Sequence, residues 1–194
     1  MALLFGVLAP IQIFNDWVLK LGRLLAIVAL TCMVLAILGQ VFFRYVLNDA
    51  PNWTEEGARF LMLWMTGLIA PLAYRQGGFV AIDMAERALS PFFSRILTFV
   101  LLICAMVVLV TCMQLGWDNV NSLTGRGKSA SLRLPLDWFG GERMKFKNSW
   151  AYTSLFVGFC LLTVVNLELL LREVIKALGG GHRLKALGDA GPID

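Results

Sequence analysis

Residues 24 to 43 read LLAIVALTCMVLAILGQVFF, twenty consecutive residues without a charge, and Arg23 and Arg44 stand at the two ends of this run. An α-helix rises about 1.5 Å per residue, so twenty residues reach about 30 Å, which is the thickness of the hydrocarbon core of a bilayer. The run therefore predicts a helix that crosses a membrane with an arginine near each surface.

Three further runs of spanning length follow, at residues 55–74, 96–117 and 150–171. Thr54 can cap the first of them, and Glu55 suits the positive end of a helix. Pro71 lies inside it and removes one backbone hydrogen bond, which is tolerated where a neighbouring helix covers the freed carbonyl. Over all 194 residues, 58% are hydrophobic and 15% are charged, against about 25% charged in soluble domains. The sequence predicts an all-α integral membrane protein with four transmembrane helices in a single domain, 1–194.

Two shorter segments are amphipathic. In residues 1–19 apolar side chains recur at helical spacing, but Pro10, Asn15 and Asp16 interrupt the run, and no base precedes it as in a signal peptide. Residues 79–96, after Gly77 and Gly78, place apolar and polar side chains on opposite helical faces. We expect amphipathic interfacial helices at the N-terminus and between spans two and three.

Several classes of chemistry lack their residues. The four cysteines lie in apolar runs without a C-x-x-C pair, and the single histidine, His182, lies in the polar tail. The excess of bases, 17 against 13 acids, flanks apolar spans and so does not indicate nucleic acid. We predict that the chain is not an enzyme and holds no catalytic residue, cofactor or metal.

The sequence gives less information about how the helices pack and about which way the chain is oriented in the membrane. No two glycines lie four residues apart, so we expect no tight glycine-on-glycine crossing between the helices. Glu168 stands one helical turn before Arg172 and can pair with it. With the N-terminus inside, nine bases would face the cytoplasm and eight would face out, so charge alone does not choose the orientation.

Three short segments carry a family resemblance. They are QVFFRY at 40–45, PNWTEE at 51–56, and AYRQGG at 73–78 followed by Ile82 and Asp83. In type, order and spacing they resemble the small membrane subunit (Q-type, DctQ-like) of tripartite ATP-independent periplasmic (TRAP) transporters. The resemblance covers residues 24–95. The chain departs from the family pattern at Phe79, where a histidine is common, and in an inserted stretch at 140–147.

The resemblance implies a multi-pass protein of the bacterial inner membrane with both termini cytoplasmic, an outer loop at 118–149 and a cytoplasmic tail at 172–194. It also implies two partners. A large membrane subunit would hold the substrate and sodium sites and move them by an elevator motion, with this chain as a static scaffold beside it. A periplasmic substrate-binding protein would deliver an organic acid or similar small solute. Sodium ions are then expected on the large subunit and not on this chain.

The candidate contact residues lie at the ends of the spans. The span centres are uncharged, whereas ionisable residues at mid-membrane usually mark a transport pathway. We therefore expect contacts with the large subunit or with lipid, and the alternative is a solvated rim of snorkelling charges. The candidates are Arg44, Tyr45, Trp53, Glu55, Glu56 and Arg59 at the outer boundary, and Arg75 and Asp83 at the inner surface.

The third loop, 118–149, carries six bases against three acids. Charges at the rim of an interface mainly steer association, so the loop is a candidate dock for an acidic patch on the binding protein. Arg126, Lys128 and Arg133 are the residues that we expect to contribute, and a merely mobile basic loop is the alternative.

Two other functions stay open at this point. The chain could be a scaffold or assembly subunit of a different membrane complex, which would share the uncharged span centres. It could also be an independent small channel or exporter, which would need a polar path. The candidates for such a path are Thr31, Gln40, Thr66, Thr111, Gln114, Thr163 and Asn166.

Overall fold

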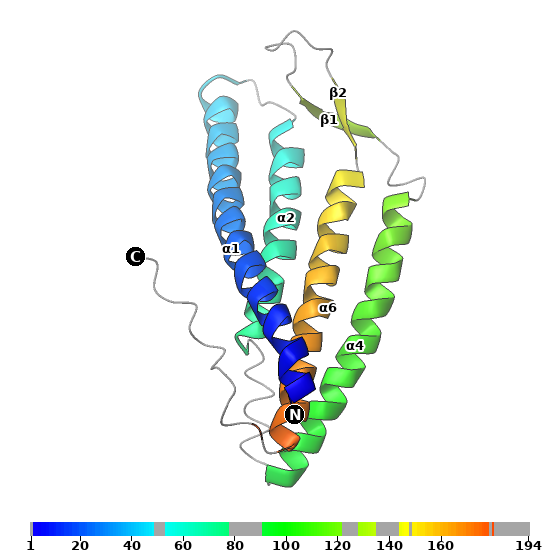
Figure 1. Cartoon of the computed structure of the whole chain (residues 1–194). Coiled ribbons are helices and arrows are strands. Elements are labelled where there is room, and N and C mark those ends of the chain that lie inside the picture. The colour runs from blue at the N-terminus through cyan, green and yellow to red at the C-terminus, as the bar shows by residue number, and fades with distance from the viewer. Residues whose placement is uncertain are drawn as a thin grey trace.

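The computed structural model describes residues 2–48, 53–77, 91–121, 128–134, 144–147, 149–178 and 180. It contains four long helices, α1 (Ala2–Tyr45), α2 (Trp53–Arg75), α4 (Pro91–Asn121) and α6 (Ser149–Ala177) (Figure 1). Each is long and apolar enough to cross a membrane. The predicted all-α membrane protein is confirmed, and each helix contains one of the expected spans.

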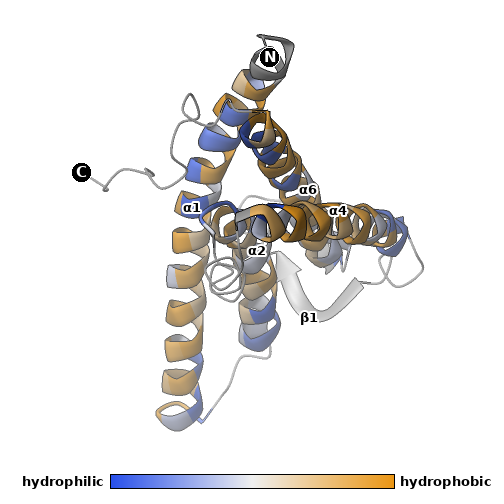
Figure 2. Ribbon diagram, turned by 90° about the horizontal axis from the view of Figure 1, so that it is seen from below, coloured by the Kyte–Doolittle hydropathy of each residue, from blue (hydrophilic) through white to orange (hydrophobic). Residues whose placement is uncertain are grey.

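The helices form an open layer in the order α1, α2, α6, α4. Neighbours in this order pack along their lengths, and α1 also reaches α6 at the end of the layer that holds the N-terminus (Figure 1). Seven apolar side chains in the described helices are buried, namely Leu8, Leu19, Ala26, Pro71, Leu102, Val165 and Ile175. Many large hydrophobic side chains of the helices are instead exposed, and hydrophobic residues make up most of the length of the helices in Figure 2. Large apolar faces are therefore left for lipid or for another protein.

The N-terminal segment does not form a separate interfacial helix. Residues 2–45 are one continuous helix, so α1 is about 66 Å long, and Pro10 lies inside it without ending it. The reason is visible at Asn15 and Asp16, whose polar side chains find partners on α2 and α6 and need no aqueous surface. The second expected interfacial helix lies largely outside the described residues, and residues 91–96 form the first turns of α4.

The predicted outer loop contains a short antiparallel hairpin. Its strands are β1 (Lys128–Leu134) and β2 (Met144–Lys147), paired as Lys128 with Lys147, Arg133 with Lys145 and Leu134 with Met144, with a register shift between the first two pairs. The hairpin lies at the end of the layer opposite to the N-terminus of α1, with β1 near α2 (Figure 1). Because α4 continues to Asn121, the loop begins later than predicted.

Helices α2 and α6 cross at very close range, and the expectation of no glycine-on-glycine crossing was wrong. A Cβ added to Gly158 would lie 3.0 Å from the Cα of Gly67, and one added to Gly67 would lie 2.7 Å from the carbonyl oxygen of Ser154. Glycine pairs within one helix are one route to such a crossing, but here the two glycines come from different helices, and Ser154 and Gly158 supply the small residues at four-residue spacing. The crossing fixes the centre of the layer.

Candidate functional site

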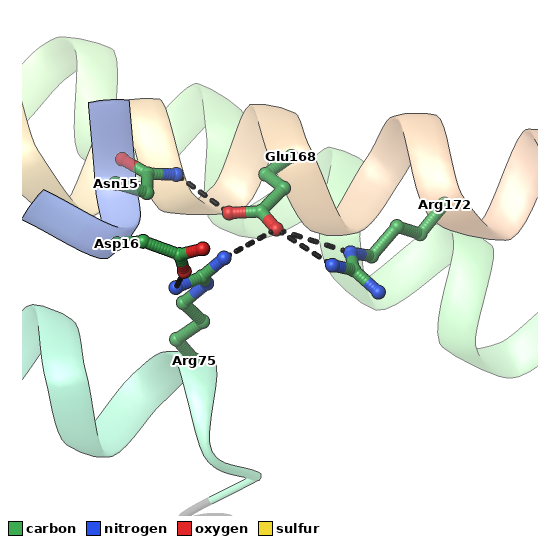
Figure 3. A network of polar contacts seen from close by, with 5 residues as sticks. All are labelled: Asn15, Asp16, Arg75, Glu168 and Arg172. Carbon is green, nitrogen blue, oxygen red and sulfur yellow. Dashed lines mark hydrogen bonds and ion pairs between the residues drawn. The ribbon is translucent and has the colours of Figure 1, made fainter. Parts of the chain in front are cut away.

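Polar side chains from three helices meet at the end of the layer that holds the N-terminus (Figure 3). Asn15 and Asp16 come from α1, Arg75 is the last residue of α2, and Glu168 and Arg172 lie one turn apart on α6. We call these five residues the ion cluster. All the cluster side chains except that of Asp16 are buried or nearly so. The contacts of the ion cluster between different helices join residues that are 59 to 153 positions apart in the chain.

Glu168 is the centre of the ion cluster and is fully buried. The Asn15 side chain donates to Glu168 Oε2 at 2.6 Å, and Arg75 donates to Oε1 at 2.9 Å. Arg172 reaches the same Oε1 with two nitrogens, at 3.1 Å from Nε and 3.0 Å from Nη2. Both carboxylate oxygens are thus engaged by donors of the protein itself.

The charges of the ion cluster balance. Arg75 pairs with Asp16 as well as with Glu168, and Arg172 pairs with Glu168, so two cations face two anions. A charge taken out of water costs several kcal/mol unless partners compensate it, and removing one partner from a buried pair leaves an uncompensated charge. The arrangement therefore favours one relative placement of α1, α2 and α6, and each helix holds the others in it.

A second polar contact ties α4 to the same end. The Tyr74 hydroxyl donates to Asn166 Oδ1 at 2.5 Å, and Asn166 Nδ2 donates to the carbonyl oxygen of Leu102 at 3.1 Å. Asn166 is fully buried, and its neighbours belong to α2 and α4. Together with the ion cluster, this contact connects all four long helices by side-chain hydrogen bonds.

The candidates at the outer boundary lie at the opposite end of the layer. Arg59 pairs with Glu55 at 2.5 Å, as their four-residue spacing allows, and both side chains are largely exposed. Such surface pairs contribute about 0 to 1 kcal/mol. Arg44, Tyr45 and Trp53 are also exposed, on the last turn of α1 and the first of α2. The described contacts do not gather these residues into one cluster.

The remaining candidates have different outcomes. Arg75 was expected at the inner surface, and the structure places it in the ion cluster with Asp16 and Glu168. Asp83 and Arg126 lie outside the described residues, whereas Lys128 and Arg133 lie on β1. The pairing of Glu168 with Arg172 is confirmed.

Sequence reasoning missed Asn15 and Asp16, which it interpreted as interruptions of an amphipathic segment. A better signal was available. Polar residues near the end of a long apolar helix can face opposite charges at the ends of other helices that reach the same membrane boundary. Asp16, Arg75 and Glu168 satisfy that condition.

A groove of about 210 Å³ lies between α4 and α6 towards the hairpin end. It is lined by Cys112, Leu115, Gly116, Asn119, Tyr152, Leu155 and Phe159. Without a charged residue in its wall, it is suited to an apolar occupant and not to an ion.

Residues 33–176 match the family described as the DctQ component of tripartite ATP-independent periplasmic transporters. The chain belongs to the DctQ family. Over 113 residues the DctQ chain is 30% identical to a TRAP transporter small permease protein of Haemophilus influenzae, a match that covers 55% of this chain and 70% of that protein. It is also 26% identical over 116 residues to the isethionate TRAP transporter permease protein DctMQ of Oleidesulfovibrio alaskensis. That match covers 56% of this chain but 18% of the much longer relative.

Family membership confirms the resemblance found in the sequence. The DctQ chain is a small subunit of a TRAP transporter, a component of a transport system and not an enzyme. Its four apolar helices make it a multi-pass protein of the inner membrane, and the fused DctMQ relative implies a large membrane partner. Three residues of the ion cluster, Arg75, Glu168 and Arg172, lie within the matched segment, whereas Asn15 and Asp16 precede it.

Proposed function

We propose that this DctQ chain is the static scaffold subunit of a sodium-driven TRAP transporter, with both termini in the cytoplasm. It would pack beside a large elevator-type subunit that imports an organic acid or a similar small solute. The observation that carries the proposal is the ion cluster. Its charges lie at one end of the layer and neutralise one another, while the centres of the spans are uncharged. A translocation path would instead need ionisable or polar groups turned towards cargo at mid-membrane.

A scaffold must keep its shape while its partner moves. The ion cluster holds α1, α2 and α6 together, and Asn166 bridges α2 to α4. At Gly67 and Gly158 the backbones of α2 and α6 are in direct contact, without a side chain between them. These devices support a role as a rigid frame, because sliding α2 along α6 would drive backbone into backbone.

The proposal assigns the sodium ions to the large subunit. A sodium site needs several oxygen atoms that are free to coordinate a cation. The most deeply buried carboxylate of the described residues, Glu168, already accepts four contacts from Asn15, Arg75 and Arg172. With two guanidinium groups against it, this carboxylate is a poor cation ligand.

The hairpin supports a docking role towards the periplasmic binding protein. Its described strands contain four bases, Lys128, Arg133, Lys145 and Lys147, and no acid. The register sets Lys128 opposite Lys147 and Arg133 opposite Lys145, so the two strands bring their bases together at one end of the layer. An acidic surface of the binding protein would be attracted to such a concentration of bases. We include Arg126 in this dock. We assign the candidates at the outer boundary, together with Asp83, to contacts with the large subunit or with lipid; these are Arg44, Tyr45, Trp53, Glu55, Glu56 and Arg59.

The main experiment is reconstitution in liposomes. The DctQ chain, the large subunit and the binding protein are combined, and uptake of radiolabelled organic acids is measured with and without an inward sodium gradient. We expect gradient-dependent uptake from the complete system and none from the DctQ chain alone. Uptake by the chain alone would instead establish an independent carrier, and copurification with an unrelated complex would establish an assembly subunit of another machine.

Docking is tested by graded charge changes in the hairpin. Arg126, Lys128 and Arg133 are all changed to Gln in one variant and all to Glu in another. Because rim charges act on association, uptake at low binding-protein concentration should fall for the Gln variant and fall further for the Glu variant, and should recover at high concentration. Equal uptake by the wild type and the two variants at every binding-protein concentration would contradict the docking role and would leave the proposed scaffold role unaffected.

A further inference from the structure

Two bases of α1, Lys20 and Arg23, take no part in the contacts described above. Lys20 is exposed and Arg23 is partly exposed, and neither makes a hydrogen bond or an ion pair with another described residue. The sequence predicts that Arg23 lies near a membrane surface, because the uncharged run 24–43 begins directly after it. The contact of the adjacent Gly22 with α2 shows where both bases lie in the structure.

The two bases lie beside the middle of α2 and not at its end. A Cβ added to Gly22 would lie 3.4 Å from the carbonyl oxygen of Leu68, which is next to the midpoint of the uncharged run 60–74. Arg75, where α2 ends, is seven residues further on, or about 10 Å away. Because the two bases flank Gly22 along α1, both lie at a depth where α2 has only uncharged residues. We therefore call them the mid-layer bases.

A base at this depth requires a counter-ion. A charged side chain is costly near the centre of a bilayer, and that cost is relieved by pairing with an anion, by snorkelling to the headgroups or by local thinning of the bilayer. Helix α2 offers no acid at this depth, and Asp16, one turn before Lys20, already pairs with Arg75. The other acid of the ion cluster, Glu168, is fully buried against two arginines. The anion for the mid-layer bases therefore comes from outside the described residues.

The surroundings of the mid-layer bases favour a lipid phosphate as that anion. In an α-helix the Cα–Cβ bonds tilt towards the N-terminus, so both side chains lean towards the end of the layer that holds the ion cluster. In that direction Trp17, three residues before Lys20, is 76% exposed, and tryptophan rings are typical of the headgroup level of a membrane. The Asp16 side chain is 46% exposed, and a charged group that protein leaves uncovered needs water or headgroups around it. Headgroups of this leaflet thus come within about 6 Å of Lys20 along α1.

We propose that the mid-layer bases bind the phosphate of a membrane lipid, which is drawn inward along α1 from the leaflet at the ion-cluster end. Their three-residue spacing places the two Cβ atoms about 5 to 6 Å apart on one helical face, so both side chains can reach one phosphate. The Arg23 guanidinium can donate two parallel hydrogen bonds to phosphate oxygens, and Lys20 adds a compact charge. Because the site carries two positive charges, it favours an anionic lipid such as phosphatidylglycerol over a zwitterionic one.

The test is photo-labelling of the full DctQ chain in lipid nanodiscs, without and with its large subunit. One set of nanodiscs contains a photoactivatable phosphatidylglycerol whose diazirine lies near the glycerol. The matched set contains a diacylglycerol with the same chains and diazirine but no phosphate. After irradiation, adducts are mapped by mass spectrometry. We expect adducts of the phospholipid on residues 17–27 of α1, and far fewer adducts of the diacylglycerol there.

Three variants locate the contact. Lys20→Gln combined with Arg23→Gln should lower the labelling of residues 17–27 by roughly 30-fold, as expected for the loss of two bases near a lipid surface. The exchange variant Lys20→Arg with Arg23→Lys keeps both charges and should retain most of the labelling. Lys145→Gln with Lys147→Gln removes the same charge from the hairpin and should label α1 like the wild type. The mid-layer bases bind no described residue, so the variants should fold, which size-exclusion profiles verify.

Three results would overturn the inference. Equal labelling of residues 17–27 by the two probes would show that lipid tails and not a phosphate make the contact. Equal labelling of the wild type and the double Gln variant would show that the mid-layer bases do not hold the lipid. Loss of the labelling when the large subunit is present would show that a group of that subunit, such as a carboxylate, is the anion. None of these results bears on the proposed scaffold role, because the inference does not depend on it.

Discussion

Replacing Glu168 by Gln tests whether the ion cluster holds the helices together. The amide keeps the size of the carboxylate but removes its charge, so that within the ion cluster Asp16 is the one remaining anion and the five residues together carry a net positive charge. Removing one member of a buried ion pair costs about 3 to 5 kcal/mol. Because Asp16 still pairs with Arg75, we expect a loss of stability at the lower end of this range, about 3 kcal/mol. This loss corresponds to roughly a 150-fold change in the unfolding equilibrium.

The assay is thermal unfolding of the purified chain in mild detergent, followed by size-exclusion fluorescence. At about 2 to 4 °C per kcal/mol for a chain of this size, the midpoint of the Glu168→Gln variant should fall by roughly 6 to 12 °C. Glu173→Gln is the matched control on the same helix. Glu173 pairs with Lys176 at 2.5 Å, and the Lys176 side chain is half-exposed. A pair at the surface contributes less than about 1 kcal/mol to stability. Equal midpoints for the two variants would refute the reasoning that the buried charge network fixes the layer.

Four other substitutions test the packing by the same assay. Gly67→Ala places a Cβ against the Ser154 carbonyl and should lower the stability by about 1 to 3 kcal/mol. Gly39 has open space around it, so Gly39→Ala should raise the stability by about 0.5 to 1 kcal/mol. The reverse order of the two midpoints would contradict the close crossing. Trp64→Phe should stay within about 1 kcal/mol of wild type, because the buried indole N–H has no partner among the described residues, and a larger loss would reveal one. Asn166→Leu should cost about 1 to 2 kcal/mol by removing the bridge to α4, and an unchanged midpoint would argue against that bridge.

The positions of the spans followed from the sequence because they depend on a local property. An uncharged run of twenty residues, such as 24–43, must be a helix in a membrane whatever its neighbours are, since no water can satisfy its backbone. The pairing of Glu168 with Arg172 followed for a similar reason, because both lie on one helix a turn apart. The family could be recognised from short motifs at the ends of the first two spans.

The ion cluster and the glycine crossing did not follow, because they depend on which helices become neighbours. Asn15 looks like an interruption until α6 lies beside it, and Gly67 looks unremarkable until Gly158 faces it. The charge balance left the orientation undecided for a different reason, because bases flank the spans on both sides in nearly equal number. Sequence patterns within one element carry no information about contacts made across elements, except where partner charges reach the same boundary.

In lipid the hydrophobic effect does not draw apolar helices together, because the surrounding tails are as apolar as the helices. This explains why the DctQ chain buries so few large apolar side chains and relies on close backbone contact and on buried polar groups instead. The same physics leaves the outward apolar faces of the layer to lipid or to another protein. Along α1, Asn15 and Asp16 bind partners in the ion cluster and Leu8, Leu19 and Ala26 are buried, whereas most of its other large apolar side chains are exposed. The ion cluster fixes the rotation of α1 and so determines which of its side chains face outward.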